Sequence, residues 1–242
     1  MDPSLYRKMA ETQQQHWWFA ARRYILQRLL HRLASSPFSI LEIGCGPGGN
    51  LAMLSGFGPV CAVEMDAYAL DEARKIAPQT EIRQGWLPDN IPFYDQKFGL
   101  VCLFDVLEHV EDDQGALDCV YQLVEKGGMV LLTVPAFQWL YGAHDEAHHH
   151  FRRYTAGRLR LLAERAGFRV KRHGYFNTLL FPLVASLRMT GRLSGNARSD
   201  DAAIPPPRTN RLLYWIFAAE AWLVPHFFFP FGVSAIAVLE KP

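Results

Sequence analysis

The fold of this 242-residue chain is decided by one segment, Leu41-Glu42-Ile43-Gly44-Cys45-Gly46-Pro47-Gly48-Gly49. The apolar residues that open the segment predict the end of a buried strand, and its four glycines stand where a helix should begin. Glycine permits positive φ and lets a ligand lie directly against the backbone. The segment therefore predicts a ligand-binding turn between a strand and a helix.

Short apolar runs alternate with helical stretches along most of the chain. The predicted strands cover residues 39–43, 60–64, 81–84, 99–104, 129–134, 168–175 and 232–239. The predicted helices cover residues 4–32, 50–56, 67–76, 112–125 and 155–166. Strands that alternate with helices form parallel sheets covered on both faces, so the pattern predicts an α/β fold with a seven-stranded, mostly parallel sheet.

The chain is predicted to be a single domain over residues 1–242. Its parts are an aromatic-rich N-terminal helical cap (1–35), the core (37–176), an apolar insertion (177–230) and the last strand (231–242). The insertion adds about 55 residues that a simple connection between two strands does not need. Its tryptophan and phenylalanine side chains exceed what a surface hairpin should expose, which leaves three alternatives: a lid over an apolar substrate, a homodimer surface or a membrane-docking patch.

The composition excludes several classes of protein. Lysine and arginine total 25 against 24 aspartate and glutamate residues, so the chain lacks the basic footprint of a protein that binds nucleic acid. The four cysteines form no CxxC pair, which favours reduced thiols in a cytosolic protein. The first residues are polar, and no stretch of about 18 residues is free of both charge and proline, so neither export nor a spanning helix is expected. The expected location is cytoplasmic, with peripheral contact to a membrane left open.

The chemistry of the glycine turn distinguishes between two kinds of ligand. Its glycines also satisfy the dinucleotide pattern G-x-G-x-x-G, and Glu64 stands where a ribose-binding carboxylate is expected in either case. However, Pro47 removes an N–H group that a pyrophosphate needs, and the carboxylate of Glu42 would repel phosphate. Both features favour a ligand with a cationic end, although an NAD-dependent oxidoreductase remains the alternative.

Seven short motifs follow one another between residues 40 and 135. They are 42–48 (EIGCGPG), 62–64 (AVE), 85–88 (GWLP), 91–93 (IPF), 98–101 (FGLV), 104–110 (FDVLEHV) and 125–128 (EKGG). Taken together, they resemble the motifs of the class I S-adenosylmethionine-dependent methyltransferases. The resemblance implies a Rossmann-like fold, S-adenosylmethionine as the cofactor and methyl transfer as the reaction.

The resemblance also implies which residues border the cofactor. Glu42 and the glycine turn would border its methionine part, Glu64 its ribose hydroxyls, and Asp105 its sulfonium. Where this chain has Trp86, similar families often have an aspartate for the adenine amino group, so that contact must come from the backbone or from Asp89, or be absent. The complete predicted set is Trp18, Arg22, Glu42, Gly44, Cys45, Gly46, Glu64, Met65, Gly85, Trp86, Leu87, Phe104, Asp105 and His109.

The aromatic and basic stretch near the N-terminus fits a cap over this cofactor. His16-Trp17-Trp18-Phe19 is followed by Arg22 and Arg23, and Arg22 could pair with the methionine carboxylate. The alternative is an aromatic stripe that docks a helix on the core, with both arginines in solvent.

The stretch over residues 139–154 is the candidate for acceptor chemistry, because ligands of an open parallel sheet bind at the carboxyl ends of its strands. Histidine accepts protons near neutral pH, so His144, partnered by Asp145, is the first candidate for a catalytic base and His148 the second. Two alternatives stay open: a salt-bridged structural loop, and a metal site in which His144 and His148 lie one helical turn apart. No metal ligand is assigned.

The function predicted from these features is methyl transfer to a small, apolar or lipid-linked acceptor. The alternatives are an NAD-dependent oxidoreductase and a non-catalytic cofactor-binding module of the same fold. The expected partner is the small-molecule acceptor and not nucleic acid, while a homodimer stays open. Eight lysine or arginine residues between 152 and 172 are expected to form a solvated helix face, with anionic acceptors or lipid headgroups as the alternative ligands.

Overall fold

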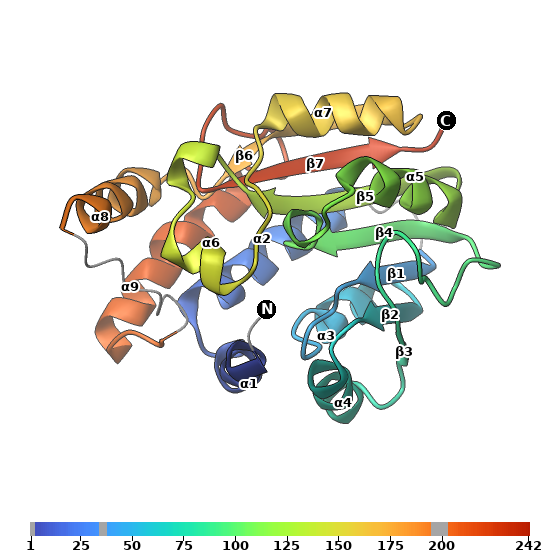
Figure 1. Cartoon of the computed structure of the whole chain (residues 1–242), viewed down its shortest axis with the longest axis horizontal. Helices are drawn as coiled ribbons and strands as arrows, with labels where there is room; N and C mark the ends of the chain where they lie inside the picture. The colour runs from blue at the N-terminus through green and yellow to red at the C-terminus, as the bar shows by residue number, and fades with distance from the viewer. Residues whose placement is uncertain (1–2, 34–37, 195–202) are drawn as a thin grey trace.

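Seven strands form one sheet at the centre of the protein (Figure 1). The computed structural model describes residues 3–33, 38–194 and 203–242. Across the sheet the strands follow the order β3-β2-β1-β4-β5-β7-β6. Their bounds are β1 Ile40–Ile43, β2 Val60–Glu64, β3 Glu81–Gln84, β4 Phe98–Phe104, β5 Val124–Pro135, β6 Arg169–Phe176 and β7 Ser234–Glu240.

Strands β1 to β5 pair in parallel, and β7 runs antiparallel to both of its neighbours, β5 and β6. The prediction of a seven-stranded, mostly parallel sheet is confirmed. The strand order reverses between β1 and β4, because the chain moves outward to β2 and β3 before it returns to β4. In such sheets the ligand crevice lies at the carboxyl ends of the strands beside the reversal. The residues that follow Ile43, Glu64 and Phe104 therefore border the candidate site.

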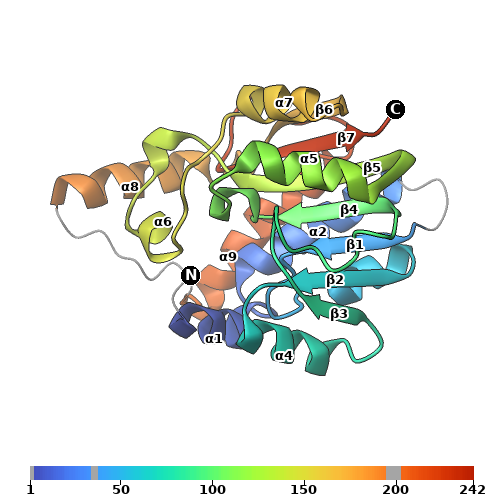
Figure 2. The same cartoon turned by 45° about the vertical axis from the view of Figure 1, so that its right-hand side comes forward.

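Helices cover both faces of this sheet (Figures 1 and 2). Their bounds are α1 Pro3–Thr12, α2 Trp17–Leu33, α3 Leu51–Leu54, α4 Ala67–Ile76, α5 Asp113–Leu123, α6 Ala143–Ala147, α7 Ala156–Arg165, α8 Phe181–Ser194 and α9 Pro207–Ala218. On one face, α5 and α7 share an apolar core with side chains of β4, β5 and β7. On the other face, α2 and α9 share a second core with the sheet, and α3 and α4 pack near β2 and β3.

The single helix predicted over residues 4–32 is wrong, because the chain breaks into α1 and α2. Asn210 of α9 accepts a hydrogen bond from the N–H of Trp17 through Oδ1 (3.0 Å). Its Nδ2 donates to the carbonyl of Gln15 (2.9 Å). Arg23 donates to the carbonyl of Gln13 (2.8 Å). In a continuous helix these backbone groups would form hydrogen bonds with one another. Here they form hydrogen bonds with the side chains of Arg23 and Asn210, and Asn210 lies 193 residues from Trp17.

Most other predicted elements end within two residues of the observed ones. β5 is longer than predicted, since Val124 already pairs with Phe98 of β4. In the insertion, Pro206 is extended (φ −48°, ψ 145°) and Pro207 begins α9, while residues 195–202 of the predicted insertion lie outside the described residues. No helix within the described ranges is long and apolar enough to cross a membrane.

The insertion is tied to the sheet by the side chain of Glu220. Its fully buried carboxylate accepts the N–H groups of Asn177 (2.6 Å), Thr178 (2.6 Å) and Leu179 (2.9 Å), which follow β6. Burial raises the pKa of Glu220, and the three N–H groups oppose that rise. The segment after α9 is therefore fixed to the end of β6, 43 residues earlier in the chain.

Replacing Glu220 by alanine should lower the free energy of unfolding by about 3 kcal/mol, because three N–H groups, one of them at the fully buried Asn177, lose their acceptor. The control is Glu164→Ala, which removes an exposed carboxylate whose ion-pair partner, Arg160, is one helical turn away. The control should change the unfolding free energy by less than about 0.5 kcal/mol. Urea titrations of the three proteins measure both effects, and equal stabilities of the two variants would contradict an anchoring role of Glu220.

Candidate functional site

The glycine turn after β1 is bound to the end of β2 through Glu64. The N–H of Gly46 donates to Oε2 of Glu64 (2.8 Å), and the N–H of Asp66 donates to Oε1 (2.9 Å). Gly44 has a φ of 71°, and a Cβ there would lie 2.6 Å from the side chain of Val106, so only glycine fits. Burial raises the pKa of Glu64. Its carboxyl group stands between two strand ends, where a ribose-binding carboxylate is expected.

Glu42 lies on β1 beneath this turn and is fully buried. Its Oε1 accepts a hydrogen bond from Nδ2 of Asn50 (2.8 Å), whereas Oε2 has no hydrogen-bond partner among the described residues. Burial raises the pKa of Glu42 to about 8, outweighing the opposing effects of Asn50 and Arg22. At neutral pH burial therefore favours the protonated form of Glu42, and the contact of a charged Glu42 carboxylate with the ligand stays a prediction.

Asp105 follows β4 and has a left-handed backbone conformation, with φ 58°. Its Oδ1 accepts a hydrogen bond from the hydroxyl of Thr133 on β5 (3.1 Å), and Oδ2 forms an ion pair with Arg22 of α2. Arg22, predicted to pair with the methionine carboxylate, thus pairs with Asp105. Positive φ in a residue other than glycine costs about 1–3 kcal/mol and concentrates at functional sites. Its conformation and its place at the strand reversal make Asp105 a candidate site residue.

The first helix, α1, covers the crevice beside the glycine turn. Gln13, just after α1, donates its Nε2 to the carbonyl of Pro47 (3.2 Å). The Sδ of Met9 would lie 3.8 Å from a Cβ built on Gly46. Tyr6 is buried, and burial together with the charge of Glu64 raises its pKa. The helix therefore lies against the turn and Glu64, as expected of a cap over a ligand.

The segment predicted to border adenine follows β3. The N–H of Gly85 donates to the carbonyl of Glu64 (3.1 Å), and a Cβ on Gly85 would clash with the carbonyl of Asn90. Trp86 and Asn90 exchange backbone hydrogen bonds (2.8 and 3.0 Å). The side chains of Met65 and Trp86 are exposed. Two apolar surfaces are thus available near the ends of β2 and β3.

Other residues predicted to border the cofactor lie in the core. Trp18 stacks on Phe217 of α9, with 5.2 Å between the ring centroids. This contact corresponds to the alternative in which the aromatic stripe docks a helix on the core. Cys45, Leu87 and Phe104 are buried. Any role of these side chains beside a cofactor stays a prediction.

The stretch after β5 is organised around Asp145 of α6, which is fully buried. Its carboxylate accepts hydrogen bonds from Arg153 (2.8 and 3.0 Å), from Nδ1 of His150 (2.9 Å) and from the N–H of Gly142 (2.9 Å). Arg188 of α8 also donates to it (3.2 Å). Burial alone would raise the pKa of Asp145, but His150 and Arg153 lower it below its ordinary value. Asp145 is therefore a charged anchor that joins this loop to α8.

Four histidine rings gather beside this anchor. The ring centroids lie 4.3 Å apart for His144 and His148, 5.7 Å for His148 and His150, and 4.6 Å for His109 and His150. Burial lowers the pKa of His109, His144 and His148 to about 3, with Arg188 adding to the effect at His144. In this structure these three rings are neutral at pH 7 and do not titrate near it, unlike an exposed histidine.

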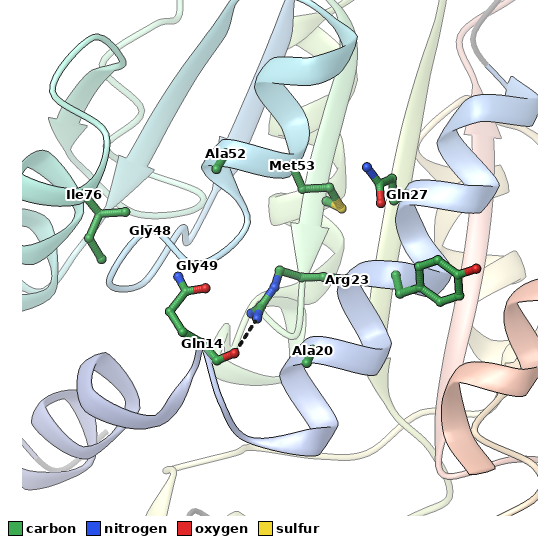
Figure 3. Close-up of a pocket in the computed structure, with 10 residues that line it drawn as sticks. Gln14, Ala20, Arg23, Gln27, Gly48, Gly49, Ala52, Met53 and Ile76 are labelled. Atoms are coloured by element: carbon green, nitrogen blue, oxygen red, sulfur yellow. Dashed lines mark hydrogen bonds between the residues drawn. The ribbon is translucent and has the colours of Figure 1, made fainter. Parts of the chain in front are cut away.

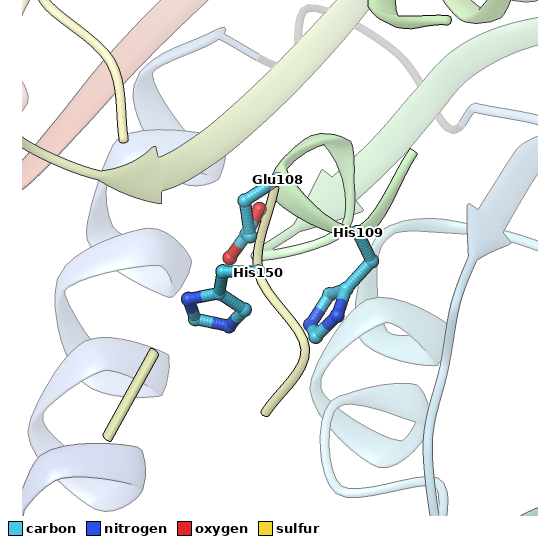
Figure 4. Close-up of side chains that lie close together, drawn as sticks. All are labelled: Glu108, His109 and His150. Atoms are coloured by element: carbon cyan, nitrogen blue, oxygen red, sulfur yellow. The ribbon is translucent and has the colours of Figure 1, made fainter. Parts of the chain in front are cut away.

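Glu108 completes this cluster (Figure 4). One ligand atom from each of Glu108, His109 and His150 lies within 4.8 Å of the others. Burial and the charge of Asp105 raise the pKa of Glu108 well above its ordinary value. The motif over 104–110 is a sequence signal for Glu108 and His109, but no signal indicated that His150 lies beside them.

A cavity of about 260 Å³ lies on another side of the glycine turn (Figure 3). Arg23 and Met53 line it together with Gly48 and Gly49. Burial lowers the pKa of Arg23 to about 10, and its guanidinium donates to the carbonyl of Gln14 (3.5 Å). Since Gly44, Glu64 and Asp105 are not among its lining residues, we treat the cavity as separate from the candidate site.

Several basic residues between 152 and 172 form ion pairs or hydrogen bonds with other residues of the protein. Arg152 and Arg158 form ion pairs with Asp113 (3.1 and 2.9 Å), and Arg153 pairs with Asp145. Arg172 donates to two backbone carbonyls that precede His226. The prediction of a solvated face is therefore wrong for the buried Arg153 and the partly buried Arg152 and Arg172, whereas Arg158 is exposed as predicted.

Residues 17–173, more than half of the chain, match a family model described as a methyltransferase domain. A protein of Mycolicibacterium smegmatis named "Probable S-adenosylmethionine-dependent methyltransferase" is 28% identical over 161 residues, which are 65% of this chain and 62% of that protein. A ubiquinone biosynthesis O-methyltransferase of Photorhabdus laumondii is 31% identical over 100 residues, which are 39% of this chain and 41% of that protein. The chain thus spans less than two thirds of the length of these relatives.

A solved structure shares the fold over nearly the whole chain. It is the complex between the Haloferax volcanii Trm112 methyltransferase activator and a methyltransferase. The TM-score is 0.63 at 15% identity, and the match covers 99% of this chain and 95% of that chain.

The raised pKa of Glu42 predicts a pH dependence of stability. The folded value is about 8 and the ordinary value is 4.5, so the stabilisation by the protonated group is complete below pH 4.5 and is lost as the pH rises toward 8. Relative to Glu42→Gln, which does not titrate, the wild type should lose up to about 1.4 kcal/mol per pH unit across this interval.

Urea unfolding of both proteins from about pH 4 to about pH 9 measures this difference. The two stability curves should converge toward acidic pH and separate toward alkaline pH, with the variant the more stable there. Parallel curves would contradict the buried, protonated state of Glu42.

Proposed function

The chain belongs to the methyltransferase-domain family and uses S-adenosylmethionine, and we propose that it transfers the methyl group to an oxygen of a small, apolar or lipid-linked acceptor. We also propose that residues 1–242 act as a single domain, in which the insertion borders the acceptor. The observation that carries the proposal is the set of groups at the carboxyl ends of β1, β2 and β4. There the turn at Gly44, the carboxyl group of Glu64 and the side chain of Asp105 stand at the ends of three neighbouring strands.

These groups fit the cofactor chemically. S-adenosylmethionine supplies a methyl group on a positively charged sulfur, which is already activated for displacement. Each oxygen of Glu64 accepts one backbone N–H and keeps a lone pair for a ribose hydroxyl. The carboxylate of Asp105 favours positive charge nearby, and the partnerless Oε2 of Glu42 can take part in a hydrogen bond to the ligand. The main task left to the protein is therefore to align the acceptor.

Aromatic side chains beside the end of β5 support an apolar acceptor. Phe137 stacks on Tyr175 (4.8 Å between centroids) and on Trp139 (6.0 Å), and Phe181 of α8 packs edge-on against Trp139 (5.9 Å). Trp139 is 47% exposed, and several apolar residues of α8 are exposed as well. Arg188 ties α8 to the histidine cluster through Asp145. An apolar acceptor lying on these rings would have its reactive end near the imidazoles.

The choice of oxygen as the methyl acceptor rests on relatives and on the polar cluster. Curated relatives from several bacteria are named as O-methyltransferases of ubiquinone biosynthesis. The imidazoles of His144 and His148 are neutral here, and a neutral ring nitrogen accepts a hydrogen bond from a hydroxyl. We assign His144 as the group that orients the acceptor hydroxyl and takes its proton as the methyl group moves, with Asp145 fixing the loop and His148 packed beside it.

The cofactor assignment predicts the effect of Glu64→Gln. The variant should bind S-adenosylhomocysteine at least tenfold more weakly, because charge-assisted hydrogen bonds to ribose are worth about 1.5–3 kcal/mol. Glu81→Gln, at an exposed carboxylate on neighbouring β3, is the control and should bind within about twofold of the wild type. Isothermal titration measures the affinities, and binding of NADH by the wild type in place of S-adenosylhomocysteine would favour the oxidoreductase.

The acceptor assignment predicts a different result for His144→Ala. Turnover of an acceptor found by screening for S-adenosylhomocysteine release should fall by about a hundredfold or more, since positioned acid–base groups contribute 10²–10⁴. The affinity for S-adenosylhomocysteine should stay within about twofold. His173→Ala, at an exposed ring on β6, is the control. Unchanged turnover in His144→Ala would contradict the assignment of His144 as the residue that orients and deprotonates the acceptor.

A further inference from the structure

Glu108 is a buried acid without a partner. Its side chain has no exposed surface, and neither Oε1 nor Oε2 has a hydrogen-bond partner among the described residues. Leaving a buried acceptor unsatisfied costs about 1–3 kcal/mol, and more for a charged group. Such an atom in a folded protein calls for an explanation, and an unobserved ion is one of the few available.

Two imidazoles stand next to this carboxyl group, and each also takes part in a hydrogen bond to another residue. Nδ1 of His150 bonds to Oδ1 of Asp145 (2.9 Å), and Arg153 holds that same carboxylate. His109 hydrogen-bonds to the backbone of His148. Histidines that bind metals almost always donate one N–H to a carboxylate or a carbonyl in this way, which leaves the second nitrogen for the metal.

We propose that Glu108, His109 and His150 bind a divalent first-row transition metal ion such as Zn²⁺. One ligand atom of each residue lies within 4.8 Å of the others. Coordination of Zn²⁺ by two histidines and a carboxylate brings the ligand atoms to roughly 3.3 Å from one another, so binding requires the three side chains to close by about 1.5 Å. Figure 4 shows the carboxyl group of Glu108 and the two rings around a common space.

The ligand types select the class of metal. Two imidazoles with one carboxylate suit zinc, iron and their neighbours, whereas magnesium and calcium prefer sites made of oxygen atoms. Local charge permits a divalent ion: Arg22 and Arg153 act on Glu108 electrostatically, but each is paired, with Asp105 and Asp145 respectively.

The site has a function beside the proposed methyl transfer, and this part of the inference rests on the proposed function. Glu108 lies three residues after Asp105, at the carboxyl end of β4, so the metal ion would stand next to the acceptor. Three protein ligands leave a coordination position open. A Lewis acid at that position lowers the pKa of an acceptor hydroxyl, so that the weakly basic His144 can take its proton.

The test uses full-length protein without a polyhistidine tag, stripped of metal by a chelator. Titration with Co²⁺, followed by visible absorption, should show one ion bound per chain, and Zn²⁺ should displace it. Glu108→Gln and His150→Asn should each weaken Co²⁺ binding by roughly a hundredfold. The matched control is His149→Asn, which removes an exposed imidazole from the same loop at a φ of 56° that asparagine tolerates. This control should bind Co²⁺ within about twofold of the wild type.

Affinity for S-adenosylhomocysteine, measured on each variant, reports whether the variant is folded. Absence of stoichiometric Co²⁺ binding by the wild type would overturn the inference, and so would equal binding by Glu108→Gln and His149→Asn. S-adenosylhomocysteine binding without metal binding would leave the proposed function intact and remove only the metal site. Metal binding by a protein that does not bind S-adenosylhomocysteine would leave the metal site intact and remove the proposed function.

Discussion

Parallel strand pairing is the constraint on which the rest of this structure depends, because it ends β1, β2, β4 and β5 at one edge of the sheet. The glycine turn, Glu64, Asp105 and the aromatic group at Phe137 all follow these strand ends, although they are spread over about a hundred residues of sequence. The reversal of strand order between β1 and β4 then leaves room at that edge, which helices would otherwise cover. The candidate site is thus a consequence of backbone hydrogen bonding before any side chain is considered.

Three acidic residues are buried at this edge, and burying a carboxylate is electrostatically unfavourable. Glu42, Glu64 and Glu108 are almost fully buried, and burial raises the pKa of each. Only Glu64 has backbone donors for both oxygens. A core built for stability alone would replace the other two with apolar residues. Their presence beside the strand ends is therefore understandable in a site that receives positive charge, from a sulfonium or from a metal ion.

Local sequence signals predicted the fold well where local interactions decide it. The bounds of β2, β3 and α4 agree with the predicted ranges, since each is a short apolar or amphipathic run closed by its own turn residues. The break between α1 and α2 was not predictable, because it depends on Asn210, which is remote in sequence. The same limit applies to the site. The turn and Glu64 follow from spacing, whereas the burial that protonates Glu42 and the meeting of Glu108 with His150 depend on packing between distant segments.

The contact between Asn210 and the junction of α1 and α2 has a consequence for synthesis of the chain. The ribosome makes α2 long before its packing partners, because its apolar face shares one core with Phe217 and with strand residues as late as Val238. Until those residues emerge, the side chains of Ile25 and Leu29 have no complete surface to bury them. The apolar face of nascent α2 therefore stays exposed while the intervening residues are made, and a chaperone that shields aromatic and leucine-rich helices would find its target there.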